Sequence, residues 1–273
     1  MESSASAKAG VLRSAWRWWN DAAARAGPIA ASRMLLAALW EFVRDSTPAR
    51  RRARYGDVDF DWEHRVNTTS AAVGWRERLV GTFHSAYQPT EPALFREMID
   101  ALQRYARSES RATELHQSFS GELSFSDFTF IDLGSGKGRV LLMASEYPFR
   151  RIIGVELLPA LHAITQENLS KYRRESQRCF ALESVCGNAT EFHFPAEPLV
   201  LYLFNPFPES GLRRVLANLE QSLRDHPRVV YVLYHNPLLE HVLRECAMLR
   251  RIGGTDQYSV YSAISAQQSA FSQ

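Results

Sequence analysis

The second half of the chain alternates short apolar runs with amphipathic segments, and this alternation constrains the fold more than any other feature. The apolar runs have the length and composition of strands, and the segments between them carry apolar residues at helical spacing. The expected strands are residues 128–133, 151–155, 182–185, 199–204, 229–234, 249–252 and 258–262. Strands that alternate with helices form parallel sheets with helices on both faces. We therefore predict an α/β fold with a doubly wound, mostly parallel seven-stranded sheet whose last strand is antiparallel.

The first 110 residues show helical spacing and no comparable series of strands. The clearest predicted helix, residues 92–106, has one apolar stripe made of Leu94, Phe95, Met98, Ile99, Leu102 and Tyr105. Thr90 is a candidate N-cap, and Pro92 lies in the first turn, where a missing N–H is tolerated. We expect residues 1–110 to form an N-terminal helical extension that acts as a lid, and residues 111–273 to form the α/β domain.

Charge and cysteine usage exclude several classes of protein. Lys and Arg number 32 and Asp and Glu 30, so the formal net charge is only +2, which argues against nucleic acid as a substrate. No stretch contains the roughly 20 apolar residues of a membrane span, and no signal peptide is visible. The three cysteines form no Cys-x-x-Cys pair and no metal-ligand pattern. We expect a cytoplasmic protein with reduced thiols, no metal and no membrane span.

A glycine-rich segment joins the first expected strand to the helix after it. Residues 132–139 read Asp-Leu-Gly-Ser-Gly-Lys-Gly-Arg. Gly134 and Gly136 allow a tight turn and close approach to a ligand because glycine has no Cβ, and Gly138 lets the helix start close to the turn. The spacing fits neither the dinucleotide fingerprint Gly-x-Gly-x-x-Gly nor the P-loop, so it disfavours a nicotinamide-dependent oxidoreductase and a P-loop nucleotide site.

This segment resembles the first motif of the class I, Rossmann-like S-adenosylmethionine-dependent methyltransferases, in which Asp-Leu-Gly-Ser-Gly-x-Gly-Arg is a common form. The resemblance covers residues 128–262 and makes residues 111–273 the methyltransferase domain. It implies that the glycine loop contacts the methionine and ribose parts of the cofactor S-adenosyl-L-methionine, through Asp132, Gly134, Ser135, Gly136, Gly138 and Arg139. It also implies that Glu156, the acid that ends the second strand, accepts hydrogen bonds from both ribose hydroxyls.

The same resemblance implies further cofactor contacts outside the glycine loop. Asn188 stands in Gly-Asn-Ala where such families often have an Asp that binds the adenine amino group, and an amide oxygen can accept the same bond. Tyr87 begins a Tyr-x-Pro segment that folds over the cofactor in related families. Tyr87 would cover the methionine end, and Gln88 or Thr90 would bind its carboxylate. An ordinary helix-entry turn is the alternative interpretation of this segment.

Two loops at the ends of later strands carry the candidate catalytic residues. Asn205-Pro206-Phe207-Pro208 resembles the Asn/Asp-Pro-Pro-Tyr/Phe loop of amino-group methyltransferases, with the third and fourth residues exchanged. In those families the Asn accepts a hydrogen bond from the target amine and the ring packs on the substrate, roles that fall here to Asn205 and Phe207. His235, at the end of the fifth expected strand, is the best candidate for a base or substrate contact, and a hydrogen-bonded structural histidine is the alternative interpretation.

Together these features predict an S-adenosylmethionine-dependent methyltransferase that acts on an amino nitrogen, or an oxygen, of a small molecule or protein side chain. The alternative is a non-catalytic Rossmann-like protein that keeps the fold as an interaction or regulatory subunit. Binding of S-adenosylhomocysteine discriminates between the two. The sequence leaves the methyl acceptor and the oligomeric state open.

Overall fold

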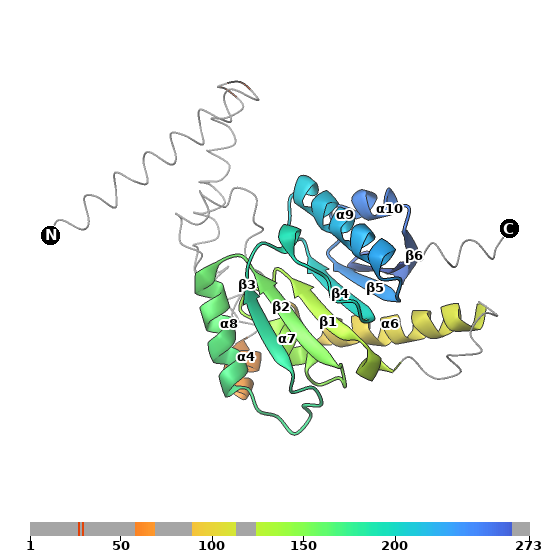
Figure 1. The fold of residues 1–273 in the computed structure, drawn as a ribbon. Helices are drawn as coiled ribbons and strands as arrows, with labels where there is room; N and C mark the ends of the chain where they lie inside the picture. The colour runs from red at the N-terminus through yellow and green to blue at the C-terminus, as the bar shows by residue number, and fades with distance from the viewer. Residues whose placement is uncertain (1–26, 28, 30–57, 69–88, 113–123, 264–273) are drawn as a thin grey trace. The chain divides into compact units, whose positions relative to one another are not determined.

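The computed structural model describes residues 27, 29, 58–68, 89–112 and 124–263 (Figure 1). The chain divides into two compact units, and the unit made of residues 61–68 and 88–273 contains the sheet. The α-helices are α4 (Val58–His64), α6 (Pro92–Ala112), α7 (Arg139–Ala144), α8 (Pro159–Lys171), α9 (Glu209–Asp225) and α10 (Glu240–Arg244). The strands are β1 (Thr129–Leu133), β2 (Arg151–Glu156), β3 (Leu182–Cys186), β4 (Leu199–Phe204), β5 (Val230–His235), β6 (Leu249–Gly254) and β7 (Tyr258–Ala263). Short 3-10 helices are η2 (Phe125–Asp127) and η3 (Ala189–Glu191).

The seven strands form one sheet in the order β3-β2-β1-β4-β5-β7-β6. Strands β1 to β5 pair in parallel, and β7 pairs antiparallel with both β5 and β6. This confirms the predicted Rossmann-like sheet with its antiparallel last strand. The chain winds outward from β1 to β3 and then returns to the other side of β1 with β4. The carboxyl ends of β1 and β4 therefore flank the switch point, where ligands of such sheets bind.

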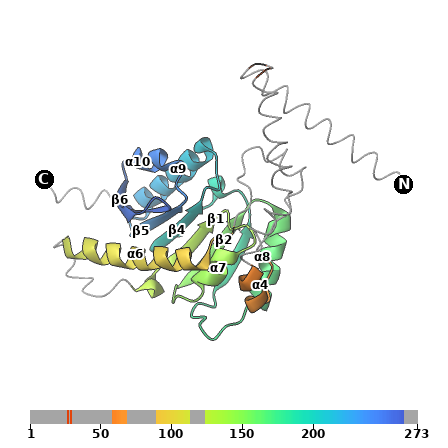
Figure 2. The same cartoon turned by 180° about the vertical axis from the view of Figure 1, so that it is seen from behind.

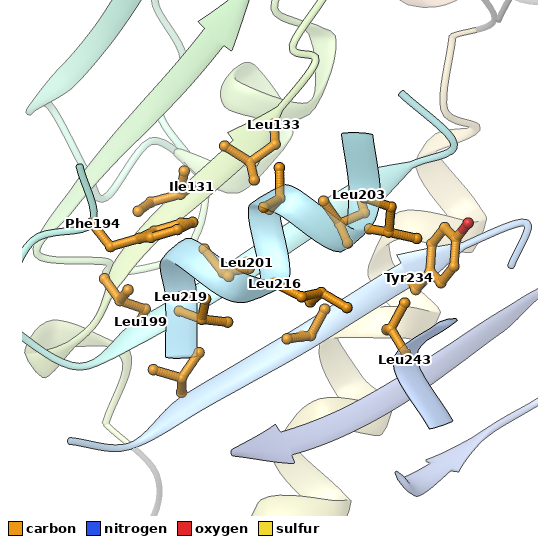
Figure 3. Close-up of a cluster of buried hydrophobic side chains, with 14 of the residues drawn as sticks. Ile131, Leu133, Phe194, Leu199, Leu201, Leu203, Leu216, Leu219, Tyr234 and Leu243 are labelled. Atoms are coloured by element: carbon orange, nitrogen blue, oxygen red, sulfur yellow. The ribbon is translucent and has the colours of Figure 1, made fainter. Parts of the chain in front are cut away.

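The two faces of the sheet bury different side chains. On one face, Leu199, Leu201 and Leu203 of β4 pack with leucines of α9, as Figure 3 shows. On the other face, Phe95 of α6 makes edge-on ring contacts with Phe130 of β1 and with Tyr202 of β4. Figure 2 shows α6 running across this second face beside α7. Alternate residues of β1, β4 and β5 thus point to the α6 side, which also carries Asp132, Tyr202 and His235.

The element boundaries differ from the predicted ones in a few places. Helix α6 continues to Ala112 rather than ending near residue 106, and α10 is short. Strand β5 includes His235, so that this side chain belongs to the sheet and not to the following loop. Most of the predicted N-terminal helical extension lies outside the described residues, and the domain boundary near residue 110 stays a prediction. Helix α6 nevertheless belongs to the same compact unit as the sheet.

The described residues contain neither a membrane-spanning helix nor a cluster of metal ligands. None of the helices there combines the length and the apolar character needed to cross a bilayer. That part of the chain also brings no three His, Cys, Asp or Glu side chains together as a metal site.

Gly154 of β2 permits close packing beneath the glycine loop, and we predict that Gly154→Ala destabilises the fold. A Cβ at this position would lie 2.6 Å from Leu141 Cδ1 and 2.9 Å from Ser135 Cβ, so the loop itself must shift. Overpacking of this kind costs about 1–3 kcal/mol in the free energy of unfolding. The midpoint of urea unfolding measures the change.

Gly187→Ala is the matched control, because its new Cβ would meet only Val185 Cγ1, at 3.9 Å. The control should unfold within about 0.5 kcal/mol of wild type. Equal stability of the two variants would contradict the close packing of the loop against β2.

Candidate active site

The turn after β1 adopts a backbone that favours glycine at three positions. Gly134, Gly136 and Gly138 have φ values of 91°, 56° and 81°, all in the left-handed region. The amides of Gly134 and Ser135 both donate to the Val155 carbonyl, at 2.8 and 3.1 Å, which fixes the turn to β2. The sequence motif is therefore a requirement of backbone geometry.

The loop after β4 and helix α8 pack so closely on this turn that they leave no room for a side chain at Gly134 or Gly138. A Cβ on Gly134 would lie 2.5 Å from Pro206 Cβ in the loop after β4, and a Cβ on Gly138 would lie 2.6 Å from Thr165 Cγ2 of α8. The Thr165 hydroxyl donates to the Gly136 carbonyl at 2.8 Å. The turn is thus held between the β4 loop and α8.

Glu156 closes the turn from β2. Its carboxylate accepts the Gly136 amide at 2.8 Å through Oε2 and the Leu158 amide at 2.8 Å through Oε1. Only 6% of the residue is exposed, and this burial raises its pKa, while the amides of Leu158 and Gly136 act in the opposite direction. A carboxylate has about four acceptor positions, so each oxygen retains capacity for one hydroxyl of a diol.

Asp132 supplies a second buried carboxyl beside Glu156. It faces Tyr202 in the register of β1 and β4, and 3% of it is exposed. Burial, and next the charge of Glu156, raise its pKa well above the usual range. Its carboxyl makes no hydrogen bond to any residue in the described ranges. A cationic ligand group placed here would satisfy it.

Two other predicted cofactor residues of the motif, Ser135 and Arg139, differ in their polar contacts with the protein. The Ser135 hydroxyl is buried without a hydrogen bond and would lie 2.8 Å from a Cβ on Gly154. Arg139 is buried, its Nε donates to Thr68 Oγ1 at 2.7 Å, and its Nη2 lies 3.5 Å from Asp61 Oδ1. The Arg139 guanidinium therefore ties α7 to residues 61–68, which comprise the second half of α4 and the residues that follow it.

That segment, residues 61–68, was missed by the sequence analysis. Asn67 Oδ1 accepts the Lys137 ammonium at 2.7 Å, and the Asn67 amide donates to Asn168 Oδ1 at 2.9 Å. Asn168 Nδ2 in turn donates to the Lys137 carbonyl at 2.9 Å. These bonds support the glycine loop on its α8 side. Short polar residues between helices carry no periodic signal, so only the folded structure reveals this support.

Asn188 lies at the predicted adenine position after β3 and is exposed. Its Oδ1 accepts the Thr190 amide at 3.0 Å and the Thr190 hydroxyl at 2.9 Å, and its Nδ2 donates to Glu191 at 3.2 Å. The side chain thus caps η3. A contact with adenine would have to share the amide oxygen with this cap.

Asn205 joins the loops after β4 and β5. Its Nδ2 donates to the Asn236 carbonyl, and its Oδ1 accepts the Tyr234 hydroxyl at 2.7 Å. Both asparagines have positive φ values, 43° and 48°, which are costly for residues other than glycine and cluster at functional sites. Phe207 is partly buried and packs against the core on the α9 side. One acceptor position of Asn205 Oδ1 remains for a substrate donor.

His235 is held in the sheet by two neighbours from β4. Its ring stacks on Phe204 with centroids 3.8 Å apart, and its Nδ1 lies 2.8 Å from the Tyr202 hydroxyl. Burial lowers the pKa of His235 to about 4, so the imidazole is neutral near pH 7. The Tyr202 hydroxyl also lies 2.7 Å from Thr90 Oγ1. Tyr202 was not predicted, because it stands in an apolar run typical of a buried strand.

Of the predicted site residues, the structure therefore brings together the glycine loop, Glu156 and Asp132. Asn205 lies on the neighbouring loop. His235 and Thr90 are linked to each other through Tyr202. Tyr87 lies outside the described residues, and its contact with the cofactor stays a prediction.

Comparisons with known proteins give similarity in structure alone. No protein-family model matches the chain, and no curated protein matches it. An RNA methyltransferase from Salinibacter ruber, solved with S-adenosyl-L-homocysteine, is 18% identical over 65% of this chain and 93% of its own, with a TM-score of 0.38. The glycopeptide N-methyltransferase MtfA, solved with S-adenosyl-L-methionine, is 12% identical over 59% and 92%, with a TM-score of 0.39. Such distant likenesses do not decide what this chain binds.

The buried carboxyl of Asp132 predicts a stability that depends on pH. The pKa of Asp132 is higher in the folded protein than the value of about 4 in the unfolded chain, so folding favours the neutral carboxyl. The free energy of unfolding is therefore highest below the unfolded pKa, and it falls as the pH rises through the folded pKa and the buried group becomes charged. Asn does not ionise, so Asp132→Asn removes this loss of stability at high pH. The variant should therefore be more stable than wild type at pH 8, by a margin that shrinks toward pH 5, as urea unfolding at both pH values would show.

Asp127→Asn is the control, since Asp127 is exposed on η2. Its stability should follow wild type at both pH values. An Asp132→Asn variant less stable than wild type at pH 8 would mean that the carboxylate has a structural partner, contrary to our description.

Proposed function

We propose that the chain is a class I methyltransferase that binds S-adenosyl-L-methionine at the carboxyl ends of β1 and β2. The observation that carries this proposal is the closure of the left-handed Gly136 turn on the Glu156 carboxylate, beside the unpartnered carboxyl of Asp132. The cofactor combines a ribose diol with an ammonium and a sulfonium. Glu156 has acceptor capacity for the diol, and Asp132 offers a negative group for a cation. The cofactor would supply an activated methyl group.

The residues around the β4 loop suit the positioning of an acceptor. Methyl transfer from a sulfonium depends mainly on alignment of the nucleophile and exclusion of water. The loop that carries Asn205 contacts the glycine turn at Pro206, so an acceptor held by Asn205 lies next to the cofactor loop. We propose that the Asn205 Oδ1 accepts a hydrogen bond from the acceptor, as expected for an amino nitrogen or a hydroxyl, and that Phe207 forms one wall of the pocket.

The acceptor class stays open within this proposal. The sequence-based argument against nucleic acid finds no support in the comparisons, since one similar structure is named an RNA methyltransferase and the other a glycopeptide N-methyltransferase. RNA, peptides and small amines therefore all belong in an acceptor screen.

The alternative, a non-catalytic protein that retains the fold, has one observation in its favour. Both amide groups expected to contact ligands, those of Asn188 and Asn205, already make hydrogen bonds within the protein. Such a protein could bind S-adenosylhomocysteine but would transfer no methyl group. Turnover, and not binding, separates this alternative from the enzyme.

Cofactor binding is tested by isothermal titration with S-adenosylhomocysteine. Wild type should bind, and Glu156→Ala should weaken binding by about 100-fold, because two hydrogen bonds to a charged group are worth roughly 3 kcal/mol or more together. Gly136→Val should abolish binding, since a β-branched residue does not tolerate the positive φ of this position.

Glu183→Ala, which removes an exposed carboxylate from β3, is the matched control and should bind like wild type. Circular dichroism of each variant checks that it is folded. Wild-type affinity in a folded Gly136→Val or Glu156→Ala would place the cofactor elsewhere.

Asn205→Ala separates orientation of the acceptor from cofactor binding. Affinity for S-adenosylhomocysteine should stay within about threefold, while methyl transfer should fall about 100-fold, the effect expected from misplacing a nucleophile by about 1 Å. Transfer of labelled methyl to the acceptor found in the screen measures the rate. Gln221→Ala on α9 removes an exposed amide that is bonded only to its helix neighbours Asp225 and Arg224 among the described residues, and it should leave the rate unchanged. An unchanged rate in Asn205→Ala would remove its proposed role.

A further inference from the structure

Three buried side chains form a continuous hydrogen-bonded chain on the α6 side of the sheet. Thr90 Oγ1 lies 2.7 Å from the Tyr202 hydroxyl, which lies 2.8 Å from His235 Nδ1. The exposed fractions of the three residues are 2%, 1% and 7%. His235 Nε2 makes no hydrogen bond within the described residues, so it is the nitrogen left for a substrate.

The chain has two possible directions because Tyr202 has one hydroxyl proton. If Thr90 donates to Tyr202, then Tyr202 donates to Nδ1, and the proton of the neutral imidazole is on Nε2. If His235 donates from Nδ1, then Tyr202 donates to Thr90, and Nε2 is a free acceptor. The direction of the hydroxyls therefore fixes the tautomer of His235.

Without a ligand the first direction is favoured. Among the described residues, the Thr90 hydroxyl has only Tyr202 within hydrogen-bond distance. In the reverse direction its proton would be buried without an acceptor, which is unfavourable. The free protein should therefore hold His235 with its proton on Nε2, as a donor and not as a base.

The position of Thr90 relative to Asp132 suits the amino-acid end of a ligand. Asp132 faces Tyr202 across β1 and β4, and the Tyr202 hydroxyl contacts Thr90. A ligand whose ammonium lies beside Asp132 would therefore direct its neighbouring carboxylate toward Thr90. A carboxylate only accepts hydrogen bonds, so Thr90 must donate to it.

We propose that Thr90 donates to the cofactor carboxylate when the cofactor binds, and that this reverses the chain and makes His235 Nε2 a hydrogen-bond acceptor. This inference rests on the proposed function. Tyr202 then donates to Thr90, and His235 donates to Tyr202 from Nδ1. One proton leaves Nε2 and one reaches Nδ1 through solvent exchange, so the imidazole stays neutral throughout.

Two features restrict His235 to its two neutral tautomers. Burial lowers the pKa of His235 to about 4, so a second proton does not bind near pH 7. The stacking on Phe204 holds the plane of the ring. Thr90 and Tyr202 are thus positioning residues, and His235 Nε2 can accept a hydrogen bond from a methyl acceptor only after the cofactor is in place.

The tautomer is measured by 15N NMR of protein labelled at histidine. The chain has eight histidines, so comparison with His235→Gln identifies the signals of His235. The free protein should show the Nε2–H tautomer, and S-adenosylhomocysteine should convert it to the Nδ1–H tautomer. 5′-Methylthioadenosine, which lacks the amino-acid end, should bind without this conversion.

Variants test the path of the switch. Tyr202→Phe should still bind S-adenosylhomocysteine but lose the ligand-dependent tautomer change. Thr90→Val should also lose the change, and Thr90→Ser, which retains a hydroxyl, should restore it.

The outcomes separate this inference from the proposed function. Absence of S-adenosylhomocysteine binding would overturn both. Binding without a tautomer change, or an equal change with 5′-methylthioadenosine, would overturn the switch alone. A switch that persists in Thr90→Val would also overturn it, because the carboxylate would then act by another route.

Discussion

The hydrogen bond from the Gly136 amide to Glu156 joins the ends of β1 and β2, and the site is arranged around it. The amide can reach the carboxylate only because the turn is left-handed, with φ of 56° at Gly136. Thr165 and Pro206 approach the same turn from α8 and from the β4 loop. The turn therefore has little freedom to move, and its amides are fixed before any ligand arrives. Such preorganisation lowers the cost of ordering on binding.

The site contains two buried carboxyl groups, and the contacts of the fold do not fully compensate them. Asp132 and Glu156 are both buried at neighbouring strand ends, and burial raises the pKa of each. Glu156 is partly compensated by two amides, whereas Asp132 has no hydrogen-bond partner in the described part of the chain. An uncompensated buried acid costs stability, and proteins retain such groups where a ligand offsets the cost. This imbalance favours a cationic ligand over an anionic one at the same turn.

The sequence predicted most of the sheet and the centre of the site, but it did not predict the supporting contacts. Apolar periodicity and glycine spacing are local, so they placed β4 at residues 199–204 and Glu156 at the end of β2. The contact of Lys137 with Asn67 joins residues 70 apart, and no local pattern encodes it. The sequence did not predict a role for Tyr202, because its hydroxyl is the one polar side-chain atom in an otherwise apolar strand. Its role is visible only from its hydrogen-bond partners. Arg139 was assigned to the cofactor from its motif position, while its described contacts are with Thr68 and Asp61.

The site has two halves, one at the ends of β1 and β2 and one at the ends of β4 and β5, and this arrangement bears on how ligands could act on each other. The β1–β2 half has the carboxyls suited to a cationic cofactor, and the β4–β5 half has Asn205 and Asn236 in strained left-handed conformations. Pro206 packs on Gly134 where the halves meet. If this packing is kept, a displacement of the turn at Gly134 would also displace the loop that carries Asn205. Packing at this contact and the Thr90–Tyr202–His235 chain are thus two independent routes by which one ligand could prepare the site for the other.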